Sequence, residues 1–116
     1  MAGITISSLY ICVDDMERAI SFYEELFDMA VTEKDDIYSV FDVGGFRFGL
    51  FAYKKKNEEH SFGSNCLPSI SFENIDVLEH KLEGKEICFP LTVIGENHVA
   101  EIVDSEGNHI EMTAPC

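Results

Sequence analysis

Chemistry-bearing side chains gather near the end of the sequence, where His109 and Glu111 stand two residues apart. Side chains two residues apart along a strand share one face of the sheet. An imidazole and a carboxylate on one face could bind a divalent metal ion, and Glu111 alone could act as a general base. Glu73, on the same polar face of an earlier strand, could supply a third ligand.

An ion pair with Arg47 is a simpler role for these carboxylates than metal binding. Its guanidinium belongs to the same polar face and could pair with Glu73 or Glu111, which would leave His109 at a rim in water. We favour this pairing over a displaced metal site of His109, Glu73 and Glu111. Three other histidines have positions that suggest no chemistry. His60 is expected in a loop and His80 on a helix, and His98 begins a strand whose facing the sequence does not define.

The cysteines give no sign of a metal or redox motif. Cys12, Cys66, Cys88 and Cys116 stand singly, without C-x-x-C spacing, which is typical of reduced thiols in a cytoplasm. Cys12 shares the polar face, but the sequence places no base beside it, so we do not favour a nucleophilic role.

The composition limits the partners. The 116 residues carry a net charge of -14, and the only basic run is 54–56, so nucleic acid is an unsuitable partner and a cationic ligand would be attracted. We find neither a basic, apolar leader pattern nor an apolar run long enough for a membrane span. We therefore expect a cytoplasmic protein without a membrane partner.

The first half of the chain predicts a strand at residues 4–13, a helix from about residue 15 to 27, and strands near 30–34, 37–43 and 46–53. Asp14 is the expected helix cap, with Glu17 completing a capping box. A polar loop is expected at 54–68. The second half predicts a strand at 69–73, a helix at 75–83 between Asn74 as cap and Gly84 as stop, and strands near 86–94, 98–104 and 108–113.

The two halves repeat one another. A shift of 61 places Asp15 on Asp76, and a shift of 62 places Asp42 on Asp104. We therefore predict a single α+β domain spanning 1–116, in which two βαβββ units, about 4–53 and 69–113, form a curved mixed sheet with the helices on its outer face. The polar concave faces would share one pocket.

Strand alternation assigns the residues of that pocket. One face is apolar and must pack on the helices, whereas the other is polar and suits a ligand. Tyr10, Phe51 and Tyr38, whose facing the sequence leaves open, could stack on a planar ligand or simply pack together. The predicted pocket residues are Ser8, Tyr10, Arg47, Gly49, Phe51, Ser69, Glu73, His109 and Glu111.

Two segments resemble a known family. The run Y-I-C-V-D-D-M-E-R-A-I-S-F-Y at Tyr10–Tyr23 and the run D-S-E-G-N-H-I-E at Asp104–Glu111 are similar to the opening strand and helix and to the D-P-D-G-N-x-I-E hairpin of the vicinal oxygen chelate superfamily. This superfamily contains glyoxalases, bleomycin-resistance proteins and extradiol dioxygenases. The resemblance covers nearly the whole chain, and it implies the fold more directly than any reaction.

The resemblance also implies where a metal ion would bind. The metal-dependent members hold their ion with four side chains, at positions that correspond here to Ser8, Gly49, Ser69 and Glu111. A serine hydroxyl is a weak ligand and glycine offers none, so only Glu111 is suitable. We therefore expect no cofactor and regard a divalent ion as the alternative.

Two main functions follow from these observations, and a regulatory or immunity partner with a degenerate pocket is a third. The first is a small-molecule binding protein of the bleomycin-resistance type with a degenerate, metal-free pocket. The alternative is a glyoxalase-like lyase, isomerase or dioxygenase with a displaced metal site or with Glu111 as general base. Family members of this length imply a homodimer. The sequence identifies neither the ligand nor whether units are exchanged between chains, and it leaves open whether any reaction is catalysed.

Overall fold

The computed structural model describes residues 3, 6–57 and 67–116. The chain divides into two compact units, Met1–His60 and Ser61–Cys116. Each unit builds its own mixed sheet and carries one α-helix, which confirms the predicted α+β class. Of the described helices, none has the length and apolar character needed to cross a membrane.

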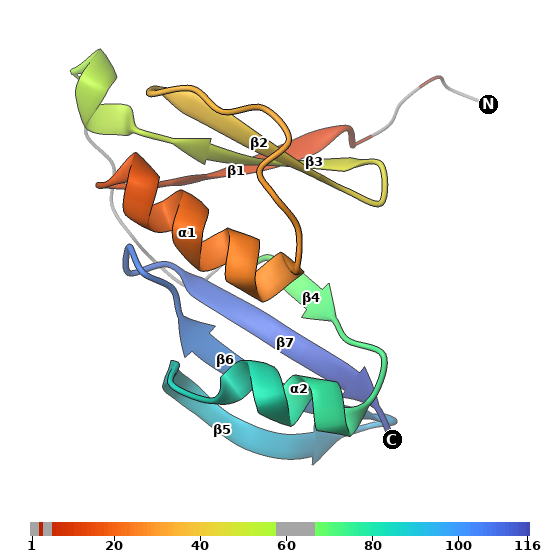
Figure 1. Ribbon diagram of the computed structural model, residues 1–116. Helices are drawn as coiled ribbons and strands as arrows, with labels where there is room; N and C mark the ends of the chain where they lie inside the picture. The colour runs from red at the N-terminus through yellow and green to blue at the C-terminus, as the bar shows by residue number, and fades with distance from the viewer. Residues whose placement is uncertain (1–2, 4–5, 58–66) are drawn as a thin grey trace. The chain divides into compact units, whose positions relative to one another are not determined.

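The first unit is a three-stranded sheet with one helix (Figure 1). Its elements are β1 (Ser8–Cys12), α1 (Met16–Phe27), β2 (Tyr38–Val43) and β3 (Phe46–Phe51), followed by a short 3-10 helix η1 (Tyr53–Lys56). The strand order is β1-β3-β2, with β1 parallel and β2 antiparallel to β3. The chain passes from β1 through α1 and β2 before it reaches β3, the parallel partner of β1.

The second unit follows the predicted βαβββ order more completely (Figure 1). Its elements are β4 (Ser69–Ser71), α2 (Ile75–Leu82), β5 (Glu86–Ile94), β6 (Asn97–Val103) and β7 (His109–Pro115). The strand order is β4-β7-β6-β5, with β4 parallel to β7 and the other pairs antiparallel. In both units the first strand therefore lies beside the last.

Two predictions of local structure were wrong. Residues 30–34 form no strand and make only an isolated bridge between Glu33 and Val40. Asp35 ends this pairing, because its carboxylate accepts hydrogen bonds from the backbone N–H groups of Ile37 and Tyr38 and turns the chain. The predicted loop begins instead with η1, whereas His60 and Cys66 lie outside the described residues.

The cap of α1 is Asp15, not the predicted Asp14. Asp15 has extended backbone angles and accepts a hydrogen bond from the Arg18 N–H at 3.1 Å. Asp14 instead accepts from the Tyr53 hydroxyl at 2.9 Å and pairs with Lys54 at 3.1 Å. The two adjacent carboxylates therefore have different roles, because Asp15 caps α1 and Asp14 binds residues of η1.

The cap of α2 is the predicted Asn74. Its side-chain oxygen accepts a hydrogen bond from the Val77 N–H at 3.0 Å. Gly84, just past the helix, has φ +74, a left-handed conformation that glycine adopts without strain. The predicted start of this helix is therefore confirmed, whereas its end comes one residue earlier, at Leu82.

The helix-facing sides of the two sheets hold the cores. In the first unit Tyr23 of α1 is fully buried, with its ring centroid 5.1 Å from that of Phe48 and 5.4 Å from that of Phe27. In the second unit Leu78 of α2 is fully buried, as is the apolar stripe of β6 and β7: Ala100, Ile102, Ile110 and Met112. Alternation along the strands then turns the polar side chains to the opposite faces.

Replacing Asp15 with alanine should lower the free energy of unfolding by about 1 kcal/mol, because the first turn of α1 loses its side-chain acceptor. Asp15→Asn is the matched control, since asparagine retains an acceptor oxygen and should preserve most of the stability. Urea denaturation followed by circular dichroism measures both variants. Equal losses in the two variants would show that the cap does not stabilise α1.

Candidate functional site

The polar face of the first unit carries the predicted side chains. In the parallel register of β1 and β3, Ser8 lies opposite Arg47, Tyr10 opposite Gly49 and Cys12 opposite Phe51. Directly opposed residues project to the same side of a sheet. These six residues, which include the five predicted pocket residues of this unit, therefore share the face that α1 does not cover.

Three aromatic rings meet on this face, and we call Tyr10, Tyr38 and Phe51 the aromatic cluster. The ring centroids of Tyr10 lie 5.5 Å from Phe51 and 6.0 Å from Tyr38. Tyr38, whose facing the sequence left open, lies opposite Phe51 in the antiparallel register. Tyr10 is 47% exposed and Tyr38 37% exposed, so the cluster is partly open to solvent.

Tyr38 also fills the space above Gly49. A Cβ atom built on Gly49 would collide with the hydroxyl and the ring of Tyr38. Burial raises the pKa of the Tyr38 phenol, which keeps the hydroxyl protonated at neutral pH. A phenol therefore occupies the place where a side chain at position 49 would lie.

Arg47 pairs with a carboxylate that the sequence analysis did not consider. Its guanidinium donates two hydrogen bonds to Glu33, at 2.7 and 3.2 Å. The bridge between Glu33 and Val40 brings this carboxylate to the edge of β2, on the face that carries Arg47. The hydrogen bond from Arg47 lowers the pKa of Glu33. The expected pairing of Arg47 with Glu73 or Glu111 is thus replaced by a pair within the first unit.

In the second unit, Ser69 and Glu111 form a hydrogen bond with each other. They lie opposite each other in the parallel register of β4 and β7, and the Ser69 hydroxyl donates to the Glu111 carboxylate at 2.6 Å. The first unit has a different register, because Ser8 lies opposite Arg47 rather than Gly49. The internal repeat therefore does not extend to the pairing of these positions.

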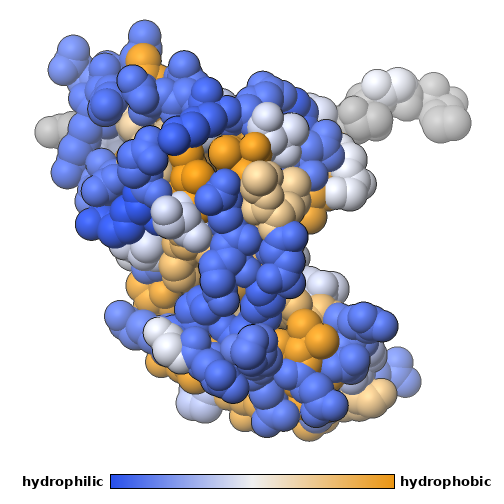
Figure 2. All heavy atoms as spheres, in the orientation of Figure 1, coloured by the Kyte–Doolittle hydropathy of each residue, from blue (hydrophilic) through white to orange (hydrophobic). Residues whose placement is uncertain are grey.

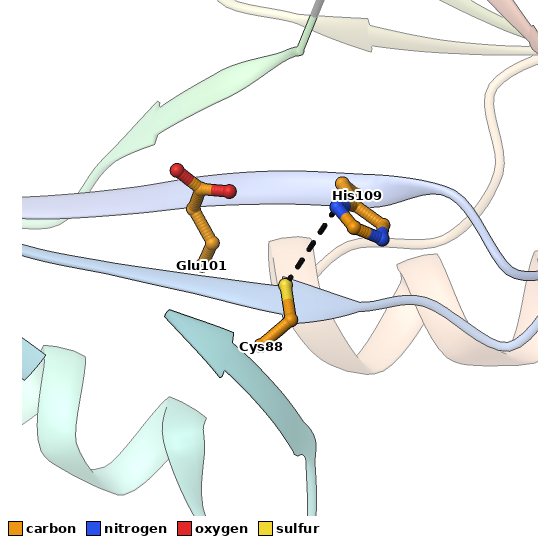
Figure 3. Close-up of side chains that lie close together, drawn as sticks. All are labelled: Cys88, Glu101 and His109. Atoms are coloured by element: carbon orange, nitrogen blue, oxygen red, sulfur yellow. Dashed lines mark hydrogen bonds between the residues drawn. The ribbon is translucent and has the colours of Figure 1, made fainter. Parts of the chain in front are cut away.

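His109 lies beside two residues that the sequence analysis did not select. Its Nδ1 atom is 3.8 Å from the Sγ atom of Cys88, and one ligand atom from each of Cys88, Glu101 and His109 lies within 4.8 Å of the others (Figure 3). His109 and Glu101 are half-buried and Cys88 is exposed. Of the other two members of the displaced set predicted for a metal ion, Glu73 lies in an exposed bend after β4 and Glu111 accepts a hydrogen bond from Ser69.

His109 and its two neighbours come from three adjacent strands. Cys88 is on β5, Glu101 on β6 and His109 on β7, and the pairing of β5 with β6 shifts register between Ile87 and Phe89. Burial raises the pKa of the Cys88 thiol, and the nearby Glu101 carboxylate raises it further. The thiol is therefore protonated at neutral pH, which does not suit a thiolate nucleophile. Alternation would have placed Glu101 on this face. Pro90 within β5 was a signal for an edge strand or a bulge, but it does not specify that Cys88 is the residue redirected.

The chain belongs to the Glyoxalase/Bleomycin resistance protein/Dioxygenase superfamily, whose family model matches residues 5–113. This match confirms the resemblance seen in the two sequence runs. A search of curated proteins found no match.

Solved structures with the same fold are similar over almost the whole chain. A protein of unknown function from Agrobacterium tumefaciens str. C58 has a TM-score of 0.80 at 17% identity, covering 100% of this chain and 98% of that one. A glyoxalase-related enzyme from Fulvimarina pelagi has a TM-score of 0.78 at 13% identity, covering 95% and 87%. A lactoylglutathione lyase from Agrobacterium tumefaciens has a TM-score of 0.71 at 17% identity, covering 95% and 92%. At these identities the likeness shows the fold alone.

The four positions that correspond to the ligands of the superfamily's metal ion do not fit an ion. Gly49 has no side chain, and Tyr38 occupies the space where one would lie. Ser8 and Ser69 offer only neutral hydroxyls, and that of Ser69 already donates to Glu111. A single carboxylate remains, which does not make a ligand set for a resident divalent ion.

Gly49→Ala should destabilise the protein by about 1–3 kcal/mol, because the new methyl group would overpack against Tyr38. In a Tyr38→Ala background the same substitution should cost less, since the blocking ring is gone and the 3.0 Å contact with the Tyr10 Cβ atom remains. A double-mutant cycle measured by urea denaturation gives the coupling between the two positions. Additive effects would contradict the close contact of Tyr38 with Gly49.

The Arg47 pair predicts a pH dependence. The pKa of Glu33 is lower in the folded state than its ordinary value of 4.5, so the pair stabilises the fold above that pH and loses its effect as the pH falls through the lowered pKa. The difference in urea midpoint between the native protein and Glu33→Gln should therefore shrink as the pH falls from about 5 to about 3.

The matched control is Glu79→Gln, which removes an exposed carboxylate from α2 and corrects for the general loss of negative charge. A Glu33→Gln difference that stays constant over this pH range, after that correction, would show that the Arg47 pair does not stabilise the folded state.

Proposed function

We propose that this chain is a small-molecule binding protein that takes a planar, neutral or cationic ligand on the polar face of its first unit. The observation that carries the proposal is the aromatic cluster, where Tyr10 and Tyr38 remain about half and one third exposed although their rings contact each other and Phe51. Exposed aromatic rings that are grouped on one face suit stacking with a ligand.

The chemistry of the cluster favours a particular class of ligand. Two phenol rings and a phenyl ring offer apolar faces with a negative quadrupole, which attract a flat apolar group or an organic cation. The net charge of -14 favours a cation further, and it disfavours an anion at the same place. Arg47, which belongs to the same face, already pairs with Glu33 and adds no uncompensated positive charge.

The proposal includes the absence of an ion from the four positions of the superfamily's metal site. Two observations support this absence. The Tyr38 side chain occupies the space above Gly49, and the Ser69 hydroxyl donates a hydrogen bond to Glu111. Binding at the aromatic cluster needs no metal ion to polarise the ligand. The function proposed for this face is therefore recognition without turnover.

The predicted cytoplasmic location and homodimer also belong to this proposal. Among the described residues, the exposed Cys88 and Cys116 form no disulfide, which suits a reducing compartment. Strand β5 lies at one edge of its sheet and carries the exposed apolar side chains Ile87, Val93 and Ile94, which suit contact with a second copy. Figure 2 shows that most of the surface visible from this side is hydrophilic, with smaller areas of apolar side chains.

A panel of planar aromatic probes with matched cationic, neutral and anionic substituents tests the proposal. We expect saturation-transfer NMR to detect binding in the order cationic, neutral, anionic. Tyr10→Ala should raise the dissociation constant of the best probe by about tenfold, which corresponds to about 1.4 kcal/mol of lost stacking.

Phe46→Ala is the control, because Phe46 is 38% exposed on the same sheet but belongs to the face that packs on α1. It should leave probe affinity unchanged, with circular dichroism verifying that both variants fold. The proposal would be overturned if each probe bound the native protein and Tyr10→Ala with the same affinity.

A further inference from the structure

We propose that Cys88, Glu101 and His109 form a binding site for a zinc-type divalent metal ion in the second unit. This site shares no residue with the four positions of the superfamily's metal site, and it lies in a different unit from the aromatic cluster. The proposal is therefore independent of the function proposed above.

Three neighbouring strands bring the ligands together. Glu101 lies opposite Glu111 on β7, and Val103 lies opposite His109, so Glu101 and His109 belong to the same face of the sheet. This is the face opposite the core stripe that includes Ile102. The site is thus built on hydrogen-bonded strands, which hold side chains more firmly than loops do.

A β-bulge supplies the third ligand. The register of β5 against β6 shifts between Ile87 and Phe89, so Cys88 is the additional residue opposite the region of Glu101. A bulge redirects a side chain and is frequent beside functional sites. The close-up in Figure 3 shows the Cys88 sulfur near the imidazole of His109, in agreement with their 3.8 Å separation.

The spacing of these atoms suits a tetrahedral ion. With a Zn–S bond near 2.3 Å and a Zn–N bond near 2.0 Å, tetrahedral geometry separates sulfur from nitrogen by about 3.6 Å. The Sγ and Nδ1 atoms are 3.8 Å apart, and the carboxylate oxygen lies within 4.8 Å of both. Tetrahedral binding would bring the carboxylate oxygen to about 3.3–3.5 Å from the other two ligand atoms. That movement is up to about 1.5 Å and needs rotation about the side-chain bonds of Glu101, whereas Cys88 and His109 are already near their bonding separation.

The combination of sulfur, nitrogen and oxygen ligands favours zinc over harder cations. Thiolate and imidazole are the ligands that Zn²⁺ prefers, whereas Mg²⁺ and Ca²⁺ prefer oxygen. Binding would release the Cys88 thiol proton to solvent, leaving two negative ligands against the charge of the ion. Three protein ligands leave a fourth position for water or a donor atom of another molecule, and the exposure of Cys88 leaves that position accessible.

Titration with Zn²⁺ and with Co²⁺ tests the site in the full chain. We expect about one ion per chain after dialysis, measured by plasma mass spectrometry. The Co²⁺ form should show a sulfur-to-cobalt charge-transfer band in the near ultraviolet, because only a thiolate ligand produces that signal. Cys88→Ser should abolish the band, and His109→Ala and Glu101→Gln should each weaken Zn²⁺ affinity by at least about tenfold.

Matched controls separate this site from other thiols and imidazoles. Cys116→Ser and His80→Ala, both at exposed positions, should retain full affinity and the charge-transfer band. Glu111→Gln distinguishes the two proposals, because it changes the remaining carboxylate of the superfamily's positions and should leave this ion in place. Circular dichroism of each variant verifies folding.

Three results would overturn the inference. The first is the absence of ion retention by the native protein at equimolar Zn²⁺. The second is retention that survives both Cys88→Ser and His109→Ala, and the third concerns Glu111. Loss of the ion in Glu111→Gln alone would place the ion at the superfamily's positions. That result would overturn both this site and the metal-free part of the proposed function. Probe binding to the aromatic cluster would still be tested separately.

Discussion

Each unit depends on a sheet that one helix covers on one side only. The parallel contact of the first strand with the last, β1 with β3 and β4 with β7, fixes which side chains meet on the uncovered face. Burial of Tyr23 in the first unit and of Leu78 in the second holds the helices against the opposite faces. A slip of one residue in either strand pair would move the polar side chains into the core, so packing on the helix determines the chemistry of the open face.

The open faces have diverged from the arrangement that gives the superfamily its metal ion. In the first unit an aromatic ring fills the space above Gly49, and in the second unit Glu111 bonds a serine hydroxyl. Structural neighbours at 13–17% identity share the scaffold, and the scaffold alone does not define a reaction. The residues that remain favour aromatic recognition in one unit and soft-metal binding in the other.

Alternation and capping explain what the sequence predicted well. Period-two patterns placed Tyr10, Phe51 and Glu111 on the polar faces, and Asn74 had a clear capping position. The choice between Asp14 and Asp15 could not be made from the sequence, because either could cap α1 and only the contact with Tyr53 and η1 distinguishes them. Local propensity does not contain such a long-range contact.

The contacts of the site residues were less predictable. Glu33 reaches Arg47 through an isolated bridge that replaces an expected strand, and Cys88 meets His109 beside a register shift in β5. Both depend on how strand edges pair, which single-sequence patterns specify weakly. Tyr38 above Gly49 needed the register of β2 with β3, since the sequence left the facing of this tyrosine open.

An amide-resolved NMR titration of the isotope-labelled native protein with Zn²⁺ would locate the ion. Chemical-shift changes should centre on Cys88, Glu101 and His109, with the amide of Gly49 unperturbed because Tyr38 closes that position. Changes centred on Ser8 and Gly49 would contradict both the zinc site and the closure of position 49 by Tyr38.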